Sequence, residues 1–415
     1  MGSDSVRGID RRRLLRRGGL AAAGVVAGVP LVSAGRALAG TTPNGSSGHD
    51  QIPPDTRPGG GYDRYVADLA ARGEFTGVIL LSHQGRTVLS RSYGLADKEK
   101  GIPNQENTAF SLSSAGQPFH AVAVLQLAQQ GRLQLTDTVG KYLTGFAKDV
   151  AEKVTIHDLL SGVSQLDSPG EDVQRVFQSR DEVHEYGEQR ARAASLVGIP
   201  GAPSTAHEEA DATIPAMIVE AVSGQAYWDY VQENIFRRVG MTGSAFYTRP
   251  QWLSDAHLAH PYMKAADGSV VDAIRHLDQS SADPYDLGKN PGRAFIDTLG
   301  NGGFATAPDL VRFAHALGDG TVLDRPWADV LTAPKTPLGP GGFAAYTFSA
   351  SIAAGQWMLQ RAGANPGVGA NLDIYPDSGW VGVILGNSDN FPLVDMLDQE
   401  MQAITGAPAG GGGGG

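Results

Sequence analysis

The sequence predicts an α+β fold of the broad α/β class, in which one antiparallel sheet is formed from both ends of the chain. Three observations predict it: a strand hairpin near the start of the folded region, a second hairpin near its end, and a series of helical patterns between them. Strands from both termini can pair in one sheet, and the helices between them then pack against it. We therefore expect a sheet with flanking helices and a helical subdomain.

Each hairpin consists of two strand-like runs around a turn. Residues 75–82 and 87–93 are rich in apolar and β-branched side chains and are separated by a turn that contains glycine. Residues 370–375 and 380–385 flank Pro376-Asp-Ser-Gly379, whose residue types favour a tight turn. Both ends of the folded region are therefore predicted to be strands.

The middle of the chain carries helical hydrophobic periodicity, and glycine follows several of the patterns, as is typical of a helix end. The predicted helices cover residues 119–130, 156–160, 214–223, 227–239 and 310–317.

The N-terminus has the features of a twin-arginine signal peptide over residues 1–39. Arg11-Arg12-Arg13-Leu14-Leu15 lies in a basic stretch, an apolar run follows from residue 18 to 32, and Ala37-Leu38-Ala39 matches a small-x-small cleavage site. A membrane anchor, the alternative, needs about 18 strongly apolar residues. This run is short, rich in glycine and alanine, and contains Pro30. We expect a secreted, extracytoplasmic protein without a stable membrane anchor.

Composition divides the rest of the chain into three parts. Residues 40–61 contain mostly Gly, Ser, Pro and Thr, and residues 407–415 end in a run of glycines. Such segments bury too little apolar surface to offset the entropy of ordering. We predict a flexible leader, one folded domain over residues 62–406, and a disordered tail.

Charge and cysteine content narrow the function. The 415 residues contain no cysteine, which excludes disulfides, thiol catalysis and thiolate metal sites. Removal of residues 1–39, which carry seven arginines against Asp4 and Asp10, takes the formal net charge from −11 to −16. An acidic surface argues against nucleic acid and anionic membranes as partners. We expect no cofactor, and the sequence leaves the oligomeric state open.

One segment carries a family resemblance. Phe110-Ser-Leu-Ser-Ser114-Ala-Gly-Gln117-Pro-Phe-His-Ala121 resembles the nucleophile region of the serine β-lactamases and penicillin-binding proteins, a family that includes class C β-lactamases, DD-peptidases and esterases. Members carry Ser-x-x-Lys here. The resemblance places Ser114 at the nucleophile position and Gln117 at the position of the lysine.

Further segments continue the resemblance in the same order along the chain. They are residues 77–97, Thr155-Ile-His-Asp-Leu-Leu160, Val222-Ser-Gly224, Gly302-Gly-Phe-Ala-Thr306 and Tyr375-Pro-Asp377. The resemblance covers nearly all of residues 62–406. It implies the β-lactamase/DD-peptidase fold, in agreement with the terminal hairpins and helical middle.

The other catalytic motifs of the family are altered. Counting back from Val222 places the family's Tyr-x-Asn motif at His207-Glu208-Glu209. The motif of Lys or His followed by x-Gly falls at Arg361-Ala-Gly363, which keeps a cation of a different kind. The resemblance implies that this strand motif engages a ligand carboxylate.

Gln117 changes the expected chemistry. A serine hydroxyl needs a base within hydrogen-bond reach, and in the family the lysine one turn along the helix is thought to supply it. A glutamine amide can hydrogen-bond to Ser114 but cannot accept its proton. We predict that the usual mechanism is lost.

Two functions remain open. In the first, Ser114 catalyses acyl hydrolysis or transfer on a peptide, ester or amide, with His207 as the base and Glu208 or Glu209 orienting its ring. In the second, the cleft is that of a pseudoenzyme in which Arg361 binds the carboxylate of cell-wall peptides or related ligands without turnover.

Each of these residues also has an ordinary explanation. Residues 207–209 can be an exposed polar loop, Arg361 can be bridged to a neighbouring acid, and Ser114 can be inherited without a function. A homologue that binds no ligand at all is then the third possibility. His257 and His260 lack an evident acidic partner, so we predict two ordinary surface histidines.

Overall fold

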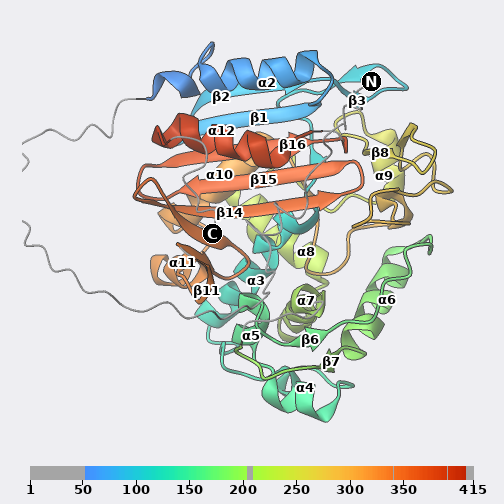
Figure 1. Cartoon of the computed structure of the whole chain (residues 1–415). Coiled ribbons are helices and arrows are strands. Elements are labelled where there is room, and N and C mark those ends of the chain that lie inside the picture. The colour runs from blue at the N-terminus through green and yellow to red at the C-terminus, as the bar shows by residue number, and fades with distance from the viewer. Residues whose placement is uncertain (1–51, 203–208, 340, 390, 408–415) are drawn as a thin grey trace, which may run out of the picture.

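The computed structural model describes residues 52–202, 209–339, 341–389 and 391–407. Its centre is an antiparallel eight-stranded sheet, shown in Figure 1. In sheet order the strands are β11 (Thr336–Gly339), β12 (Gly342–Ala344), β13 (Ser349–Ala353), β14 (Gln356–Asn365), β15 (Val368–Tyr375), β16 (Trp380–Gly386), β1 (Gly77–His83) and β2 (Arg86–Tyr93).

The sheet is assembled from both ends of the chain, as the sequence predicts. Strand β1 pairs with β2 on one side and with the C-terminal strand β16 on the other, where Gly77 faces Gly386 and His83 faces Trp380. The two predicted hairpins are β1–β2 and β15–β16.

Helices cover both faces of the sheet. In Figure 1, α2 (Gly61–Ala71) and the C-terminal helix α12 (Leu393–Thr405) lie along one face. Helices α3 (Pro118–Gln129), α10 (Ala307–Asp319) and α11 (Arg325–Thr332) belong to the larger core on the opposite face. Side chains of β1 alternate between the two cores: Val78 and Leu80 pack with α3 and α10, and Ile79 and Leu81 with α2 and α12. Burial on both faces explains the continuous apolar run of this strand.

A helical region lies beside the sheet, at the bottom of Figure 1. It contains α4 (Lys148–Lys153), α5 (Ile156–Ser161), α6 (Arg180–Arg192), α7 (Ala210–Ser223) and α8 (Tyr227–Val231), and α9 (Arg249–Ser254) lies near β8. Short strands pair as β3 (Leu95–Asp97) with β4 (Ile102–Pro103), β5 (Phe110–Ser111) with β10 (Phe304–Ala305), β6 (Leu166–Asp167) with β7 (Ser195–Leu196), and β8 (Tyr262–Lys264) with β9 (Val270–Asp272).

All five predicted helices are present, and one differs in form. The pattern over residues 227–239 becomes α8 followed by a π-helical segment, Gln232–Arg237. Helices α2, α4, α6, α9, α11 and α12 were not predicted. Helix α6 is strongly polar, and of its residues only Val183, Gly187 and Ala191 are buried. The hydrophobic periodicity that would predict a helix is therefore weak in this segment.

The predicted leader extends too far along the chain. Residues 52–61 contain a short 3₁₀ helix, Pro54–Thr56, and the fully buried Thr56 donates its hydroxyl hydrogen to the Pro53 carbonyl at 2.8 Å. The 3₁₀ helix packs against α12. The proline and glycine residues of this segment therefore belong to ordered turns and do not indicate a flexible leader. Residues 1–51 and 408–415, with the predicted signal peptide, lie outside the described residues.

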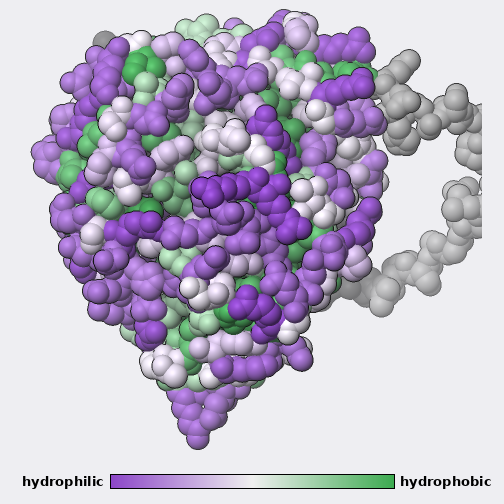
Figure 2. All heavy atoms as spheres, turned by 180° about the vertical axis from the view of Figure 1, so that it is seen from behind, coloured by the Kyte–Doolittle hydropathy of each residue, from purple (hydrophilic) through white to green (hydrophobic). Residues whose placement is uncertain are grey.

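One face of the molecule is mainly hydrophilic. Figure 2 shows the face opposite to that of Figure 1, on which hydrophilic residues cover most of the area and hydrophobic residues form small patches. No helix within the described ranges has both the length and the apolar character needed to cross a membrane.

Candidate functional site

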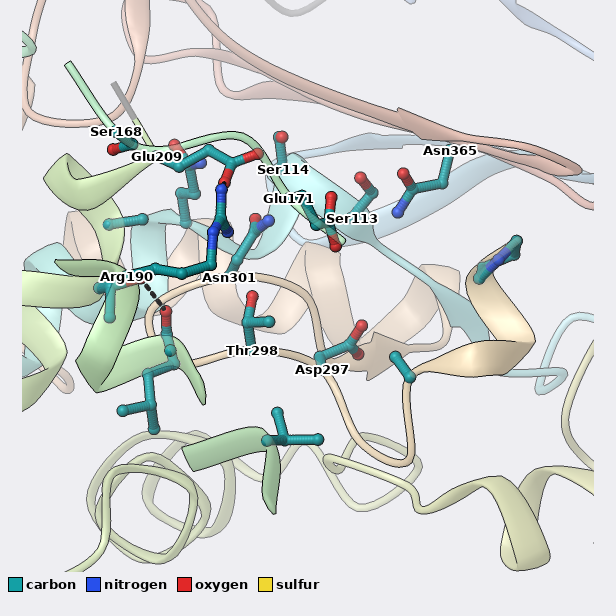
Figure 3. A pocket seen from close by; sticks show the side chains of 18 of the residues that line it. Ser113, Ser114, Ser168, Glu171, Arg190, Glu209, Asp297, Thr298, Asn301 and Asn365 are labelled. Atoms are coloured by element: carbon teal, nitrogen blue, oxygen red, sulfur yellow. Dashed lines mark hydrogen bonds and ion pairs between the residues drawn. The ribbon is translucent and has the colours of Figure 1, made fainter. Parts of the chain in front are cut away.

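A cavity of about 460 Å³ lies where the helical region meets the sheet. Its lining includes Ser114, Gln117 and Arg361, together with Glu209. Figure 3 shows Ser114, Asn301 and Glu209 around this pocket. The structure therefore brings the described candidates from three distant segments together.

The serine lies on a tightly held turn. Ser113–Gly116 form a 3₁₀ turn directly before α3, and Ser113 has a left-handed backbone with φ of 49°. The Ser113 hydroxyl donates to the Ala364 carbonyl at 3.0 Å, which fixes the turn against β14. Left-handed backbone is unfavourable for a residue with a Cβ, so this anchoring offsets strain. The neighbouring Ser114 is only partly buried.

Gly363 permits close contact between β14 and this turn. A Cβ at this position would lie 2.1 Å from the Leu112 carbonyl oxygen and 2.8 Å from the Ser114 backbone nitrogen. Any side chain there would displace the serine turn. The assigned strand motif, Arg361-Ala-Gly363, therefore lies directly beside the assigned nucleophile.

Arg361 joins the two altered motif positions. Its Nε donates to the Ser114 carbonyl oxygen at 2.9 Å, and its Nη2 donates to Oε1 of Gln117 in a short hydrogen bond. The glutamine oxygen is thus used to orient the guanidinium group. Among the described residues, no basic side chain is hydrogen-bonded to the Ser114 hydroxyl.

The charge of Arg361 is buried without an acidic partner in the described part of the chain. The residue is 8% exposed and makes no ion pair with any described carboxylate. Burial lowers the pKa of its guanidinium to about 10, which still leaves it charged at neutral pH. An unpaired buried cation is unfavourable, and an anion bound beside it relieves that cost.

The second altered motif is described only in part. Glu209 lines the cavity and forms an ion pair with Arg190 of α6, visible in Figure 3. His207 and Glu208 lie outside the described residues. The predicted role of His207 as a base, oriented by a glutamate, therefore remains a prediction.

His120 also lines the cavity, although it belongs to no sequence motif. Its Nδ1 donates to the Gly300 carbonyl at 2.6 Å, and its buried Nε2 has no hydrogen-bond partner in the described structure. Burial, together with the nearby charge of Arg361, lowers its pKa to about 4. The imidazole is therefore neutral at pH 7 but a weak base. The only sequence signal was its position one turn after Gln117 on α3.

Asp297 is a second cavity residue that the sequence did not reveal. Its carboxylate accepts a hydrogen bond from the Gly303 amide at 2.8 Å. Although the residue as a whole keeps some exposure, its carboxyl group is enclosed, and burial raises its pKa to about 6. Its pKa is thus close to neutrality. It lies in a loop without a motif, so no spacing singled it out.

The prediction for His260 is wrong. His257 is exposed, as expected, but His260 is 1% exposed, and its Nδ1 is 2.7 Å from a carboxylate oxygen of Asp272. Arg275 also forms ion pairs with Asp272 and with Asp97, so an arginine links these carboxylates. Asp272 and Asp97 lie outside the short segment His257-x-x-His260, so the spacing of these two histidines does not reveal the acidic partners.

Comparison with known proteins identifies the family. The Beta-lactamase family model matches residues 62–405. The putative penicillin-binding protein PbpX of Bacillus subtilis (strain 168) is 26% identical over 312 residues, which cover 75% of this chain and 70% of that protein.

Solved structures share the fold at low sequence identity. The penicillin binding protein from Bacillus halodurans has a TM-score of 0.68 at 21% identity, covering 80% of this chain and 97% of its own. EstCE1, a hydrolase with promiscuous acyltransferase activity, has a TM-score of 0.65 at 20% identity, covering 83% and 97%. The family match and the shared fold together show that this chain belongs to the beta-lactamase family, as a β-lactamase-like member of its serine hydrolases.

Proposed function

We propose that the cleft binds peptide-like compounds that carry a carboxylate, and that Arg361 is the group that holds it. The observation that carries the proposal is the buried guanidinium without an acidic partner in the described structure. Two of its nitrogens are already used, Nε for Ser114 and Nη2 for Gln117. Nη1 makes no hydrogen bond within the described residues, so its donors are available to a ligand.

The geometry favours binding over rapid turnover. Gln117 cannot accept the proton of Ser114, and its oxygen is bonded to Arg361. The pKa of about 4 makes His120 a poor proton acceptor at neutral pH. Loss of a catalytic base lowers rates by several orders of magnitude. We therefore propose a pseudoenzyme that retains carboxylate recognition.

Acyl hydrolysis or transfer at Ser114 is the second candidate. It is favoured by one observation: Glu209, the third residue of the altered His207-Glu208-Glu209 motif, lines the cavity. A base supplied by His207 would restore serine–histidine chemistry, with the Ser114 amide as an oxyanion donor. We also propose export through the twin-arginine route, on the N-terminal pattern alone.

Two measurements on the mature chain test these candidates. The first is intact mass after incubation with a fluorescent penicillin and with a fluorophosphonate, using Ser114→Ala as the control. Pseudoenzyme behaviour predicts no adduct, whereas an adduct absent from Ser114→Ala would establish the hydrolase.

The second measurement is calorimetry with N-acetyl-D-alanyl-D-alanine and with its C-terminal amide. We expect the acid to bind at least tenfold more tightly than the amide, and Arg361→Gln to remove the difference. Equal affinity for acid and amide in the folded protein would refute carboxylate recognition.

A further inference from the structure

A second arginine without an ion-pair partner in the described chain, Arg175, lines the same cavity. The guanidinium carbon of Arg175 is 4.7 Å from the ring centre of Phe177 and 5.1 Å from that of Tyr186. All three residues line the cavity. Stacking on two rings orients a guanidinium group by its face and leaves its N–H edge available for an anion.

The loop that carries Arg175 is fixed in place. The Asp172 amide donates to the Tyr186 hydroxyl at 2.7 Å, and Nη1 of Arg293 donates to the Val173 carbonyl at 2.7 Å. The Phe177 amide donates to the Arg293 carbonyl at 3.0 Å. The stacked geometry therefore does not depend on Arg175 alone.

Two arginines contact the ring of Tyr186, but only one has an acidic partner. Arg190 lies 5.7 Å from this ring and forms an ion pair with Glu209. Arg175 makes no ion pair and no side-chain hydrogen bond with any residue in the described ranges. The lining of the cavity thus includes the buried Arg361 beside the serine and the exposed Arg175, each without a carboxylate partner from the described chain.

We propose that Arg175 is a second anion contact of the cleft, so that the ligand carries two acidic groups. This inference rests on the proposed function, which assigns the first acidic group, a terminal carboxylate, to Arg361. The second group is an acidic side chain elsewhere in the same peptide-like molecule. A cavity of about 460 Å³ is within the range of sites for small organic ligands and short peptides.

Glu171 provides an opposing charge that sharpens the test. Its carboxylate lines the cavity and forms no ion pair with a described residue. Because Glu171 and Arg175 line the same cavity, the carboxylate of Glu171 disfavours an acidic ligand group there, and we expect its removal to strengthen binding of a diacid. If the second group were instead an ammonium, removal of Glu171 would weaken binding.

Calorimetry with two peptides that differ by one charge measures this contact. The probes are N-acetyl-glutamyl-alanine and N-acetyl-glutaminyl-alanine, which share the terminal carboxylate. We expect the glutamyl peptide to bind about tenfold more tightly, Arg175→Gln to remove that preference, and Glu171→Gln to increase it about threefold. The matched control is Arg180→Gln, because Arg180 also stacks on a ring, that of Trp228 at 4.9 Å, but does not line the cavity.

The outcomes separate the two proposals. If Arg175→Gln weakens both peptides equally or neither, or if Glu171→Gln weakens the glutamyl peptide, the second anion contact is refuted. Arg361→Gln is expected to weaken both peptides, because both keep the terminal carboxylate. If it weakens neither, carboxylate binding by Arg361 is refuted, whatever the Arg175 variant shows. Circular dichroism of each variant confirms that it is folded.

Discussion

Gln117→Glu is the smallest change that tests how the cleft handles charge. The substitution keeps the size of the side chain and the oxygen that accepts from Nη2 of Arg361. It adds one negative charge next to the buried guanidinium. The new carboxylate would pair with Arg361 and take the place that we assign to the ligand's carboxylate.

The size of the effect follows from the geometry. Two carboxylates about 5 Å apart repel by about 3 kcal/mol at an effective dielectric constant of about 20. The free Nη1 donors of Arg361 still favour the ligand, so we expect a net loss of about 2 kcal/mol. This corresponds to about 30-fold weaker binding of N-acetyl-D-alanyl-D-alanine.

Stability is expected to change in the opposite direction. The buried charge of Arg361 gains a partner, so the midpoint of thermal unfolding should rise by about 2 °C. Calorimetric titration and a thermal melt of the same preparation measure both quantities. Gln117→Met is the matched control, because it removes the accepting oxygen without adding charge, and its affinity should stay within about threefold of the original protein. Unchanged affinity together with a lower melting temperature in Gln117→Glu would refute the reasoning.

Three other predictions concern the framework of the site. Burial raises the pKa of Asp373 to about 6 and raises that of Glu400, also through the charge of Asp373. The stability that these two groups contribute is therefore complete below about pH 4 and is lost as pH rises through 6. Glu400→Gln should flatten this slope in urea melts recorded from pH 4 to 8; an unchanged slope would contradict the assignment. Arg275→Met, which removes the guanidinium group shared by the buried Asp97 and Asp272, should lower the free energy of unfolding by about 3 kcal/mol in urea titrations, and a loss below 1 kcal/mol would show that the cluster is not cooperative. Gly363→Ala places a methyl group 2.1 Å from the Leu112 carbonyl, so calorimetry should show loss of carboxylate binding, and normal affinity would mean that the serine turn can shift freely.

The sequence predicted the sheet and the main helices because these elements have strong local signals. The run Val78 to Leu81 is apolar without interruption since both sides of β1 are buried, and Pro376-Asp-Ser-Gly379 has the chemistry of a turn. Helix α12 was missed although its residues are partly apolar. It packs against α2, and a short stretch of sequence does not reveal such a tertiary contact.

Sequence motifs likewise predicted some residues of the site, and the others are evident only in the structure. Ser114 and Gln117 follow from one motif directly before α3, and Arg361 and Gly363 from a motif before Pro366. The hydrogen bond between Gln117 and Arg361 could not be predicted, because it depends on how closely β14 approaches the serine turn. His120, Asp297 and Arg175 belong to no motif, and they are identified only because they line the cavity in the structure.

The pairing of β1 with β16 has a consequence for how the chain folds. During synthesis the β1–β2 hairpin leaves the ribosome long before β16, so the inner edge of β1 stays unpaired until almost the whole domain has been made. An unpaired apolar edge favours wrong contacts, and contacts this distant in sequence form slowly. Truncation anywhere before residue 380 therefore leaves the sheet open, and nascent chains stalled at that length should bind chaperones that full-length chains release.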